Sequence, residues 1–201
     1  MKSLRIVRCL LGVVCISLLS AGPSSADHIS ARAVATVTSC DPATPVDGIL
    51  ILTERASSEG IKVVDVLLGV RGLAAGKHAV HVHAVANCAA TTNPTTGAPV
   101  PCGAAGSHLD LGPFGNNTPV TANHPYHSGD LVNVRVGSSG EGVMSTTTSR
   151  IALSPGNLSI LDADGSAVVV HALPDTYCPD PTDPNCAGGG RVACGIIRRV
   201  D

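Results

Sequence analysis

Short segments rich in Val, Ile, Leu and Thr recur along this chain, and Gly, Pro, Asp or Ser bounds each of them. No apolar pattern with the period of an α-helix continues for a useful length. Many short strand signals separated by turn residues are typical of an all-β sandwich or barrel. We therefore predict an eight-stranded Greek-key β-barrel or sandwich. Its strands are expected at Arg32–Thr38, Gly48–Arg55, Ile61–Val70, Lys77–His83, Leu131–Val136, Glu141–Ser149, Ala167–His171 and Arg191–Arg198.

Two long stretches interrupt this strand pattern. Ala84–Ser128 is rich in Pro, Gly, Thr and Asn, yet it holds two cysteines and three histidines. Leu173–Gly190 carries several prolines and another two cysteines. Loops of this length inside a compact domain are usually functional or disordered. Their histidines and cysteines favour two functional loops that metal and disulfide bonds hold in place.

The N-terminus has the features of an export signal. Basic residues precede an apolar run at Cys9–Leu19, and small residues follow at positions 24–26. This order is typical of a cleavable signal peptide, and the run is short for a membrane span. A single membrane anchor is the weaker interpretation, because no second basic flank follows the run. We expect a signal peptide at residues 1–26, one domain at residues 27–201, and a secreted, periplasmic or extracellular location.

The net charge argues against two classes of partner. Three of the 13 Lys and Arg residues, Lys2, Arg5 and Arg8, lie in the expected signal peptide, so ten remain against 15 acidic residues, a net charge of −5. A negative protein is poorly suited to bind nucleic acid or an anionic membrane surface. We expect neither as a partner.

Six cysteines remain once Cys9 and Cys15 are set aside with the signal peptide. An even number in an exported chain indicates up to three disulfide bonds, with fifteen connectivities open for six cysteines. A thiolate metal site is the alternative. No Cys-x-x-Cys pair occurs in the sequence, so disulfide bonds are favoured.

The histidines carry the strongest chemical signal. His81 and His83 are one residue apart in an expected strand, so both side chains project from the same face. His171 ends the apolar run Ala-Val-Val-Val-His, where a buried imidazole needs a partner. His108 lies in the first long loop. Imidazole suits copper and zinc, and copper binds nitrogen donors more tightly than other divalent first-row metals.

A second set of donors precedes the strand expected at Leu131–Val136. His127 and Asp130 are three residues apart and offer a nitrogen and an oxygen ligand. Each of these residues by itself is most often a solvated or packed side chain. Several histidines and an aspartate gathered near strand ends, however, indicate a metal centre.

Taken in order, five motifs resemble the copper/zinc superoxide dismutase family across nearly all of residues 27–201. They are Gly76–His83, Ala105–His108, His127–Val134, Val168–His171 with Asp175, and Gly188–Gly195. Members of this family are β-sandwiches, which agrees with the strand pattern. Fold alone does not give function, so the motifs carry the functional expectation.

The resemblance implies a role for each motif residue. The copper ligands would be His81, His83, His108 and His171, with His108 bridging copper to zinc. His127 and Asp130 would bind zinc, and Asp175 would hydrogen-bond ligands of both metals. His78 would be a supporting histidine on the other strand face, and Arg191 would attract the superoxide anion. As catalytic residues the resemblance therefore points to Arg191 and His108.

The remaining zinc ligand is open. The family places this histidine in a His-x-Gly-Pro turn, and the only Gly-Pro of the loop, Gly112-Pro113, has Asp110 at the histidine position. His124 is the other candidate, although it lies only three residues before His127. Either residue can ligate zinc. A protein that binds no zinc is the third alternative, and we expect a zinc site with His124.

The resemblance also implies disulfide pairings. The family joins a cysteine after the copper-binding strand to the residue matching Cys194. Cys88 fits by its distance from His83, as in many bacterial members, and Cys102 fits by its distance from His108. We favour Cys88–Cys194, with Cys178–Cys186 closing the second loop and Cys40–Cys102 as the third pair.

The expected function is that of a superoxide dismutase, an oxidoreductase that converts superoxide to dioxygen and hydrogen peroxide. Its cofactors would be copper and zinc, and its partner would be the superoxide anion, with a homodimer as one possible assembly. The alternative is a non-catalytic copper-binding relative for delivery or storage. A carrier would not need Arg191, so the enzyme is favoured. An adhesion module has no use for clustered histidines.

Overall fold

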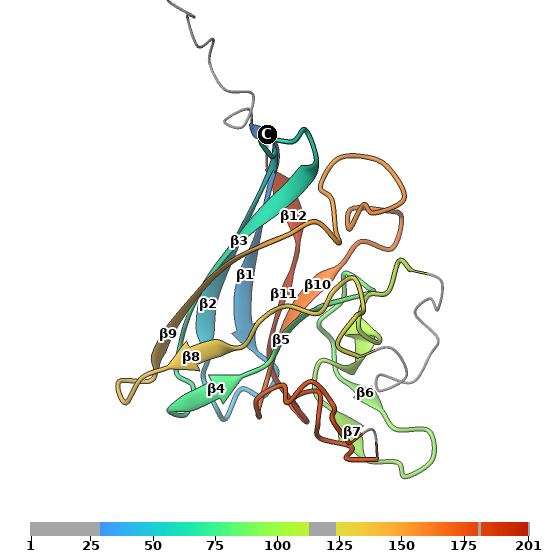
Figure 1. Ribbon diagram of the computed structural model, residues 1–201. Coiled ribbons are helices and arrows are strands. Elements are labelled where there is room, and N and C mark those ends of the chain that lie inside the picture. Colours follow the sequence, from blue (N-terminus) through green and yellow to red (C-terminus); the bar gives the residue numbers. More distant parts are fainter. Residues whose placement is uncertain (1–28, 113–123, 181, 201) are drawn as a thin grey trace, which may run out of the picture.

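One antiparallel sheet, curled almost into a closed barrel, dominates the computed structural model, which describes residues 29–112, 124–180 and 182–200 (Figure 1). Its strands run in the order β4-β8-β9-β3-β2-β1-β11-β10-β5, and β12 pairs with β1. The strands are β1 (Ile29–Ser39), β2 (Asp47–Ala56), β3 (Lys62–Arg71), β4 (Gly76–His78), β5 (Val80–His83), β8 (Val134–Val136), β9 (Glu141–Thr148), β10 (Ala167–His171), β11 (Arg191–Ile196) and β12 (Arg198–Val200). The expected signal peptide lies outside the described residues.

The all-β prediction is confirmed, and a strand forms in each of the eight expected segments. Two of the segments, Lys77–His83 and Arg191–Arg198, are each divided between two strands. The segment expected at Lys77–His83 breaks at Ala79 into β4, which pairs with β8, and β5, which pairs with β10. This one stretch therefore joins the two ends of the sheet and brings the barrel close to closure.

The first long loop contains structure that the sequence analysis did not predict. Two short strands, β6 (Thr91–Thr92) and β7 (Pro99–Val100), form a small hairpin apart from the main sheet. A single 3-10 turn follows at Gly103–Ala105. Elements of two or three residues are too short to leave a periodic signal.

None of the helices in the described ranges is long and apolar enough to cross a membrane.

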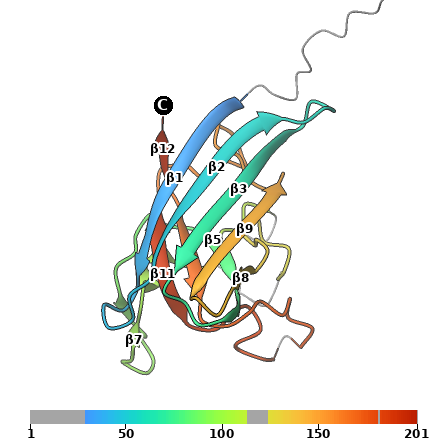
Figure 2. The same ribbon diagram turned by 90° about the vertical axis from the view of Figure 1, so that its left-hand side faces the viewer.

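The barrel interior is aliphatic and follows the two-residue period of its strands. In β2 and β3 the buried side chains alternate with more exposed ones, as at Leu50 and Leu52 and at Val66 and Leu68. Figure 2 shows β1, β2, β3 and β9 side by side as one continuous wall. Fully burying a side chain of this kind stabilises the fold by about 1.5–3 kcal/mol.

Strand β10 is buried on both faces, which explains its uninterrupted apolar sequence. Val168 and Val170 belong to the barrel core, whereas Ala167 and Val169 pack beneath the first long loop with Cys102 and other residues. The outer face of β10 and the neighbouring β5 therefore form a wall that the long loops cover. Histidines on this wall are shielded from water.

Disulfide bonds attach these loops to the barrel. Cys40–Cys102 joins the end of β1 to the first loop, with sulfur atoms 2.04 Å apart. Cys88–Cys194 joins the same loop to β11 at 2.00 Å, and Cys178–Cys186 closes the second loop on itself at 2.00 Å. These are the pairings that the sequence analysis favoured. Each bond limits the conformations of the unfolded chain.

Candidate metal centre

Strand β5 is the platform of the site. His81 and His83 project from its outer face, and both side chains are completely buried. Two segments, one with His108 in the first long loop and one with His127 and Asp130 at its end, pair with this strand. The amide of Leu109 donates to the carbonyl of Val82 at 2.9 Å, and the amide of Val82 donates to the carbonyl of Gly129 at 2.9 Å. Backbone pairing therefore brings His108, which precedes Leu109, and Asp130, which follows Gly129, beside the strand histidines.

His171 reaches the same place from β10, which pairs with β5. The ring centroid of His171 lies 4.9 Å from that of His81 and 5.6 Å from that of His83. The second loop passes so close that Gly188, at a φ of +98°, has no room for a side chain. A Cβ there would lie 2.8 Å from the Cβ of His171. Glycine is thus required both for its backbone angle and for this close approach.

The first donor group consists of His81, His83, His108 and His171, whose ligand atoms all lie within 4.8 Å of one another. In His83 the Nδ1–H donates to the carbonyl of Gly106 at 2.9 Å, and in His171 the Nδ1–H donates to the carbonyl of Gly189 at 3.0 Å. Each neutral ring then keeps its lone pair on Nε2. The two Nε2 atoms face each other at 3.4 Å. Facing lone pairs repel, so this arrangement fits a shared cation.

His81 supports the same conclusion. Its Nε2–H donates to Asp175 Oδ2 at 3.0 Å, whereas its Nδ1 is buried without a hydrogen-bond partner. An unpaired buried nitrogen is costly, and a metal ion would satisfy it. Burial also keeps the neighbouring His83 ring neutral: burial, His108 and Arg191 lower the pKa of His83 well below its usual range. The neutral imidazole is the form that binds metals.

The second donor group consists of His108, His124, His127 and Asp130, again with ligand atoms within 4.8 Å of one another. The Asp130 carboxylate is at its centre. One oxygen lies 2.9 Å from Nδ1 of His108, and the other lies 3.1 Å from Nδ1 of His124 and 3.1 Å from Nδ1 of His127. Three imidazoles and a carboxylate are a donor set that suits tetrahedral zinc.

His108 belongs to both groups. Its Nδ1 faces Asp130 in the second group, which leaves Nε2 for the first. Burial and the neighbouring His81 lower the pKa of His108 to about 3, although Asp130 opposes the shift. The ring is therefore neutral at pH 7 in the absence of metal. A side chain with one nitrogen in each group is able to bridge two metal ions.

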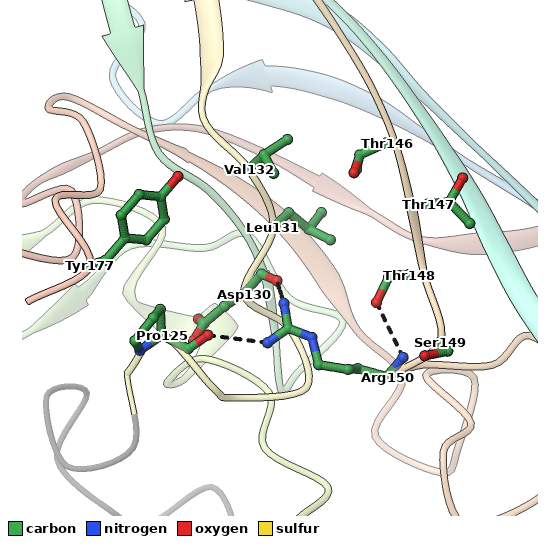
Figure 3. Close-up of a pocket in the computed structure, with 10 residues that line it drawn as sticks. All are labelled: Pro125, Asp130, Leu131, Val132, Thr146, Thr147, Thr148, Ser149, Arg150 and Tyr177. Carbon is green, nitrogen blue, oxygen red and sulfur yellow. Dashed lines mark hydrogen bonds between the residues drawn. The ribbon is translucent and has the colours of Figure 1, made fainter.

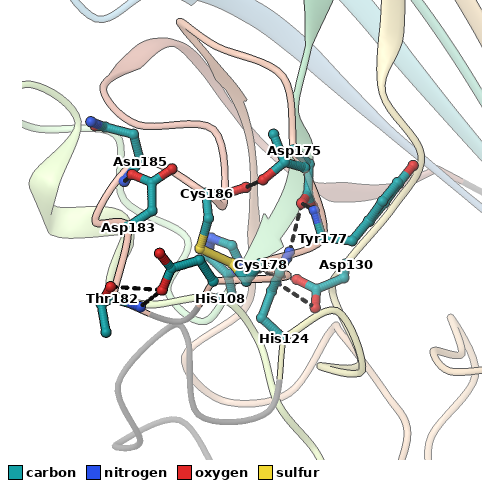
Figure 4. The surroundings of a disulfide bond; sticks show 12 residues. His108, His124, Asp130, Asp175, Tyr177, Cys178, Thr182, Asp183, Asn185 and Cys186 are labelled. Carbon is teal, nitrogen blue, oxygen red and sulfur yellow. Dashed lines mark hydrogen bonds and ion pairs between the residues drawn. A yellow bond between two sulfur atoms is a disulfide. The ribbon is translucent and has the colours of Figure 1, made fainter.

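Asp175 links the two groups from the second loop, and Figure 4 shows its contact with His124. Its Oδ2 accepts from His81, and its Oδ1 lies 2.7 Å from Nε2 of His124. Burial raises the pKa of this carboxyl, but hydrogen bonds from His124 and His81 outweigh burial and lower it. The charged carboxylate therefore orients one ring of each group.

Asn133, which the sequence analysis did not single out, fixes the backbone of Asp175. Its side-chain amide donates to the Asp175 carbonyl at 3.0 Å, and its side-chain oxygen accepts from the Asp175 amide at 2.8 Å. The Cys178–Cys186 disulfide closes the chain directly after this point (Figure 4). The amide of Thr176 also donates to the carbonyl of Cys186 at 2.8 Å. The loop conformation is thus fixed at the shared carboxylate.

Arg191 lies at the edge of the first group and is partly exposed. Its guanidinium donates to the carbonyls of Cys102 at 2.8 Å and Gly106 at 2.5 Å. Its charge lowers the pKa of His83 and, to a smaller extent than burial and the other histidines, that of His171. A positive charge is therefore held close to the histidines.

Two further predicted residues lie outside the donor groups. His78 is buried, with Nδ1 2.8 Å from the carbonyl oxygen of His171 and Nε2 2.9 Å from that of Ala74. Asp110 is also buried, and its Oδ1 accepts from the amide of Gly112 at 3.0 Å. The second group contains His124 rather than Asp110.

Arg150 is another residue that sequence reasoning missed. Its guanidinium donates to the backbone carbonyls of Pro125 at 3.1 Å and His127 at 3.0 Å, and to that of Asp130 (Figure 3). Contacts to backbone carbonyls leave no pattern in the sequence. A lone arginine after an expected strand gave no signal of this role.

An all-β barrel with two adjoining histidine-rich donor groups defines a class of metal-binding protein. Comparison with known proteins identifies the family within this class. The family model of copper/zinc superoxide dismutase (SODC) matches residues 46–197. The chain therefore belongs to the copper/zinc superoxide dismutase family. The cofactors of this family are copper and zinc, and both donor groups are compatible with them.

Similar proteins agree with this assignment. The chain is 36% identical over 140 residues to a Cu-Zn superoxide dismutase of Deinococcus radiodurans, covering 68% of this chain and 71% of that one. It is 35% identical over 133 residues to a Cu-Zn superoxide dismutase of Caulobacter vibrioides, covering 65% and 69%. Among solved structures it resembles the clock protein EA4, with a TM-score of 0.60 and 28% identity, covering 83% of this chain and 93% of that one.

Proposed function

We propose that this chain is a superoxide dismutase whose copper ion is held by His81, His83, His108 and His171. The observation that carries the proposal is the pair of Nε2 atoms of His83 and His171, which face each other at 3.4 Å with their Nδ1 atoms hydrogen-bonded elsewhere. When bound, copper supplies the one-electron couple by which one superoxide is oxidised to dioxygen and a second is reduced to hydrogen peroxide.

Side chains of the protein attract the anion, supply a proton and orient the copper ligands. Arg191 attracts and orients the anion beside the first group. When Nε2 of His108 is not engaged by copper, it would hold a proton and pass it to the reduced superoxide; water would supply the second proton that hydrogen peroxide needs and would later restore the first. Asp175 keeps the His81 ring oriented through the hydrogen bond to Nε2.

We assign zinc to His108, His124, His127 and Asp130. Asp130 is ionised, because hydrogen bonds from His108, His124 and His127 lower its pKa more than burial raises it. A carboxylate among three imidazoles supplies the charge that a divalent ion requires. Zinc bound here would stabilise the first long loop, since a ligand that binds only the folded state shifts the folding equilibrium.

A non-catalytic copper carrier is the competing function. It would use the same donor atoms but would not need a cation held beside them. Arg191, fixed by two carbonyls, therefore favours the enzyme.

The test is superoxide disproportionation by metal-free and copper-loaded protein, with copper measured on the same samples. We expect activity only in the loaded protein. His171→Ala should lose copper and activity together while the barrel still folds, because the core is aliphatic. Copper-loaded protein without activity would indicate a carrier. A fully active His171→Ala with copper bound would overturn the site assignment.

The same proposal extends to location and partners. Three disulfide bonds fit an oxidising compartment, so we assign the protein to a secreted or periplasmic location. Superoxide is the substrate, and the net negative charge disfavours nucleic acid and anionic membranes as partners. Whether two copies form a homodimer can be measured by analytical ultracentrifugation.

A further inference from the structure

Residues 124–130 supply three of the four members of the second donor group, yet this segment is irregular. Its end is attached to the barrel, because the carbonyl of Gly129 accepts from the amide of Val82 in β5 at 2.9 Å, and the amide of the following Leu131 donates to the carbonyl of Val80 at 3.3 Å. The carbonyls of Pro125 and His127 instead accept hydrogen bonds from one side chain, that of Arg150; Figure 3 shows its bond to Pro125.

Arg150 is well placed to act as a fixed support. It lies two residues after the end of β9, and its own amide donates to the hydroxyl of Thr148 at 3.1 Å. The side chain is partly buried at the edge of a cavity that Tyr177 and Thr148 also line (Figure 3). No carboxylate forms an ion pair with it among the described residues, so its hydrogen bonds go to backbone carbonyls.

The guanidinium binds three carbonyls from one segment, and two of them belong to His127 and Asp130, whose side chains are donors of the second group. A planar guanidinium presents several donors in a rigid fork, and its charge strengthens each hydrogen bond. These contacts define where the backbone of both donor residues lies. The side chains can then meet a metal ion without first ordering the loop.

We propose that Arg150 is the positioning residue of the second donor group, and that it sets the affinity of this group for zinc by fixing the carbonyls of Pro125, His127 and Asp130. This inference rests on the proposed zinc role of the group. Arg150 binds no metal itself.

The charge of Arg150 and its positioning role predict opposite changes in zinc affinity when the residue is replaced by Gln. A cation near a metal site repels the metal ion, so removing the charge alone would tighten zinc binding. Loss of positioning weakens binding, because residues that orient metal ligands typically contribute 10–100-fold in affinity. The direction of the change in Arg150→Gln therefore separates the two effects.

The experiment uses the full chain, stripped of metal and titrated with zinc, and separately with copper, against a chromogenic chelator. We expect Arg150→Gln to weaken zinc binding by about 10–100-fold and to leave copper binding nearly unchanged. Arg150→Lys, which keeps the charge but not the fork, should lie between Arg150→Gln and wild type. It also provides the comparison if Arg150→Gln does not fold. Arg71→Gln is the control, because Arg71 is exposed and pairs with Asp47.

Cobalt(II) provides a readout of geometry, since its visible absorption reports the coordination of the ion. Cobalt in Arg150→Gln should show a spectrum that differs from wild type, even at full loading. Zinc affinity and a cobalt spectrum equal to wild type in folded Arg150→Gln, with His127→Ala still abolishing zinc uptake, would overturn the positioning role alone. Zinc uptake unaffected by His127→Ala would overturn the site assignment and this inference with it.

Discussion

His83 and Arg191 donate hydrogen bonds to the same oxygen, the carbonyl of Gly106, at 2.9 and 2.5 Å. The arginine that we assign to the substrate anion is thus attached to the backbone that orients a proposed copper ligand. Gly106 itself lies at a φ of +79°, a conformation that favours glycine. The position of the charge relative to the histidines is therefore fixed by the loop.

This arrangement predicts the effect of changing the arginine. Arg191→Ala should slow superoxide disproportionation without removing copper, because the histidine donors stay in place. Arg191→Glu should slow it further, since a carboxylate repels the anion. Rates measured at equal copper content check both expectations. Loss of copper in Arg191→Ala would show instead that its bond to Gly106 is needed to hold His83.

The salt dependence of the rate should be weak. The second loop contributes Asp180 and Asp183 but no Lys or Arg before Arg191, and the chain without its expected signal peptide is negative. Salt screens distant charges over a Debye length of about 8 Å near physiological ionic strength, and screens a close arginine less. We expect the rate to change little or rise slightly with added salt. A steep fall in the wild type would reveal a positively charged approach that this charge distribution does not contain.

The strand pattern was predictable because it is local. Alternation of buried and exposed residues placed β2 and β3, and the two-residue period put His81 and His83 on one face. The break at Ala79 was not predictable in the same way. It exists because the two halves of one segment pair with different strands, which only the closing of the barrel decides.

The donor groups depended on contacts between distant residues. The position of His124 is set by Asp175, 51 residues away, and its short spacing from His127 gave no indication of that contact. Asn133 and Arg150 act on backbone atoms, so neither belongs to a motif of metal-binding side chains. Sequence reasoning found the donors by their type, and the family resemblance supplied Asp175, whereas Asn133 and Arg150 were missed.

Zinc binding by variants should show whether His124 or Asp110 is the fourth zinc ligand. His124→Ala should lose zinc and lower the melting temperature but keep copper, because His124 is in the second group only. The melting temperature of the wild type should depend on zinc concentration, and that of the variant should not. Calorimetry with and without zinc is the measurement. If Asp110→Ala has this effect and His124→Ala does not, the ligand assignment is wrong, and a wild type that takes up no zinc is a copper-only protein.

A buried acid outside both donor groups, Glu54, also stabilises the fold in a pH-dependent way. Glu54 on β2 is fully buried, and its carboxylate accepts hydrogen bonds from the amides of Leu153 at 2.6 Å and Ser154 at 3.0 Å and from the hydroxyl of Ser30 at 2.7 Å. Burial raises the pKa of Glu54, but these hydrogen bonds outweigh burial and lower it from 4.5 to about 2. The charged form therefore attaches the chain after β9 to the barrel.

A lowered pKa in the folded state stabilises the protein at high pH. The contribution of Glu54 should be complete above pH 4.5 and should disappear as the pH falls through about 2. Glu54→Gln, whose amide NH₂ cannot accept the same bonds, should lower the free energy of unfolding at pH 7 by on the order of 2 kcal/mol. Urea denaturation of metal-free wild type and variant, from pH 7 down to acid, should show this difference shrinking below pH 4.5. Exposed Glu141→Gln is the control and should show no such difference. A gap that is constant with pH would mean that packing, and not the charge of Glu54, stabilises this part of the barrel.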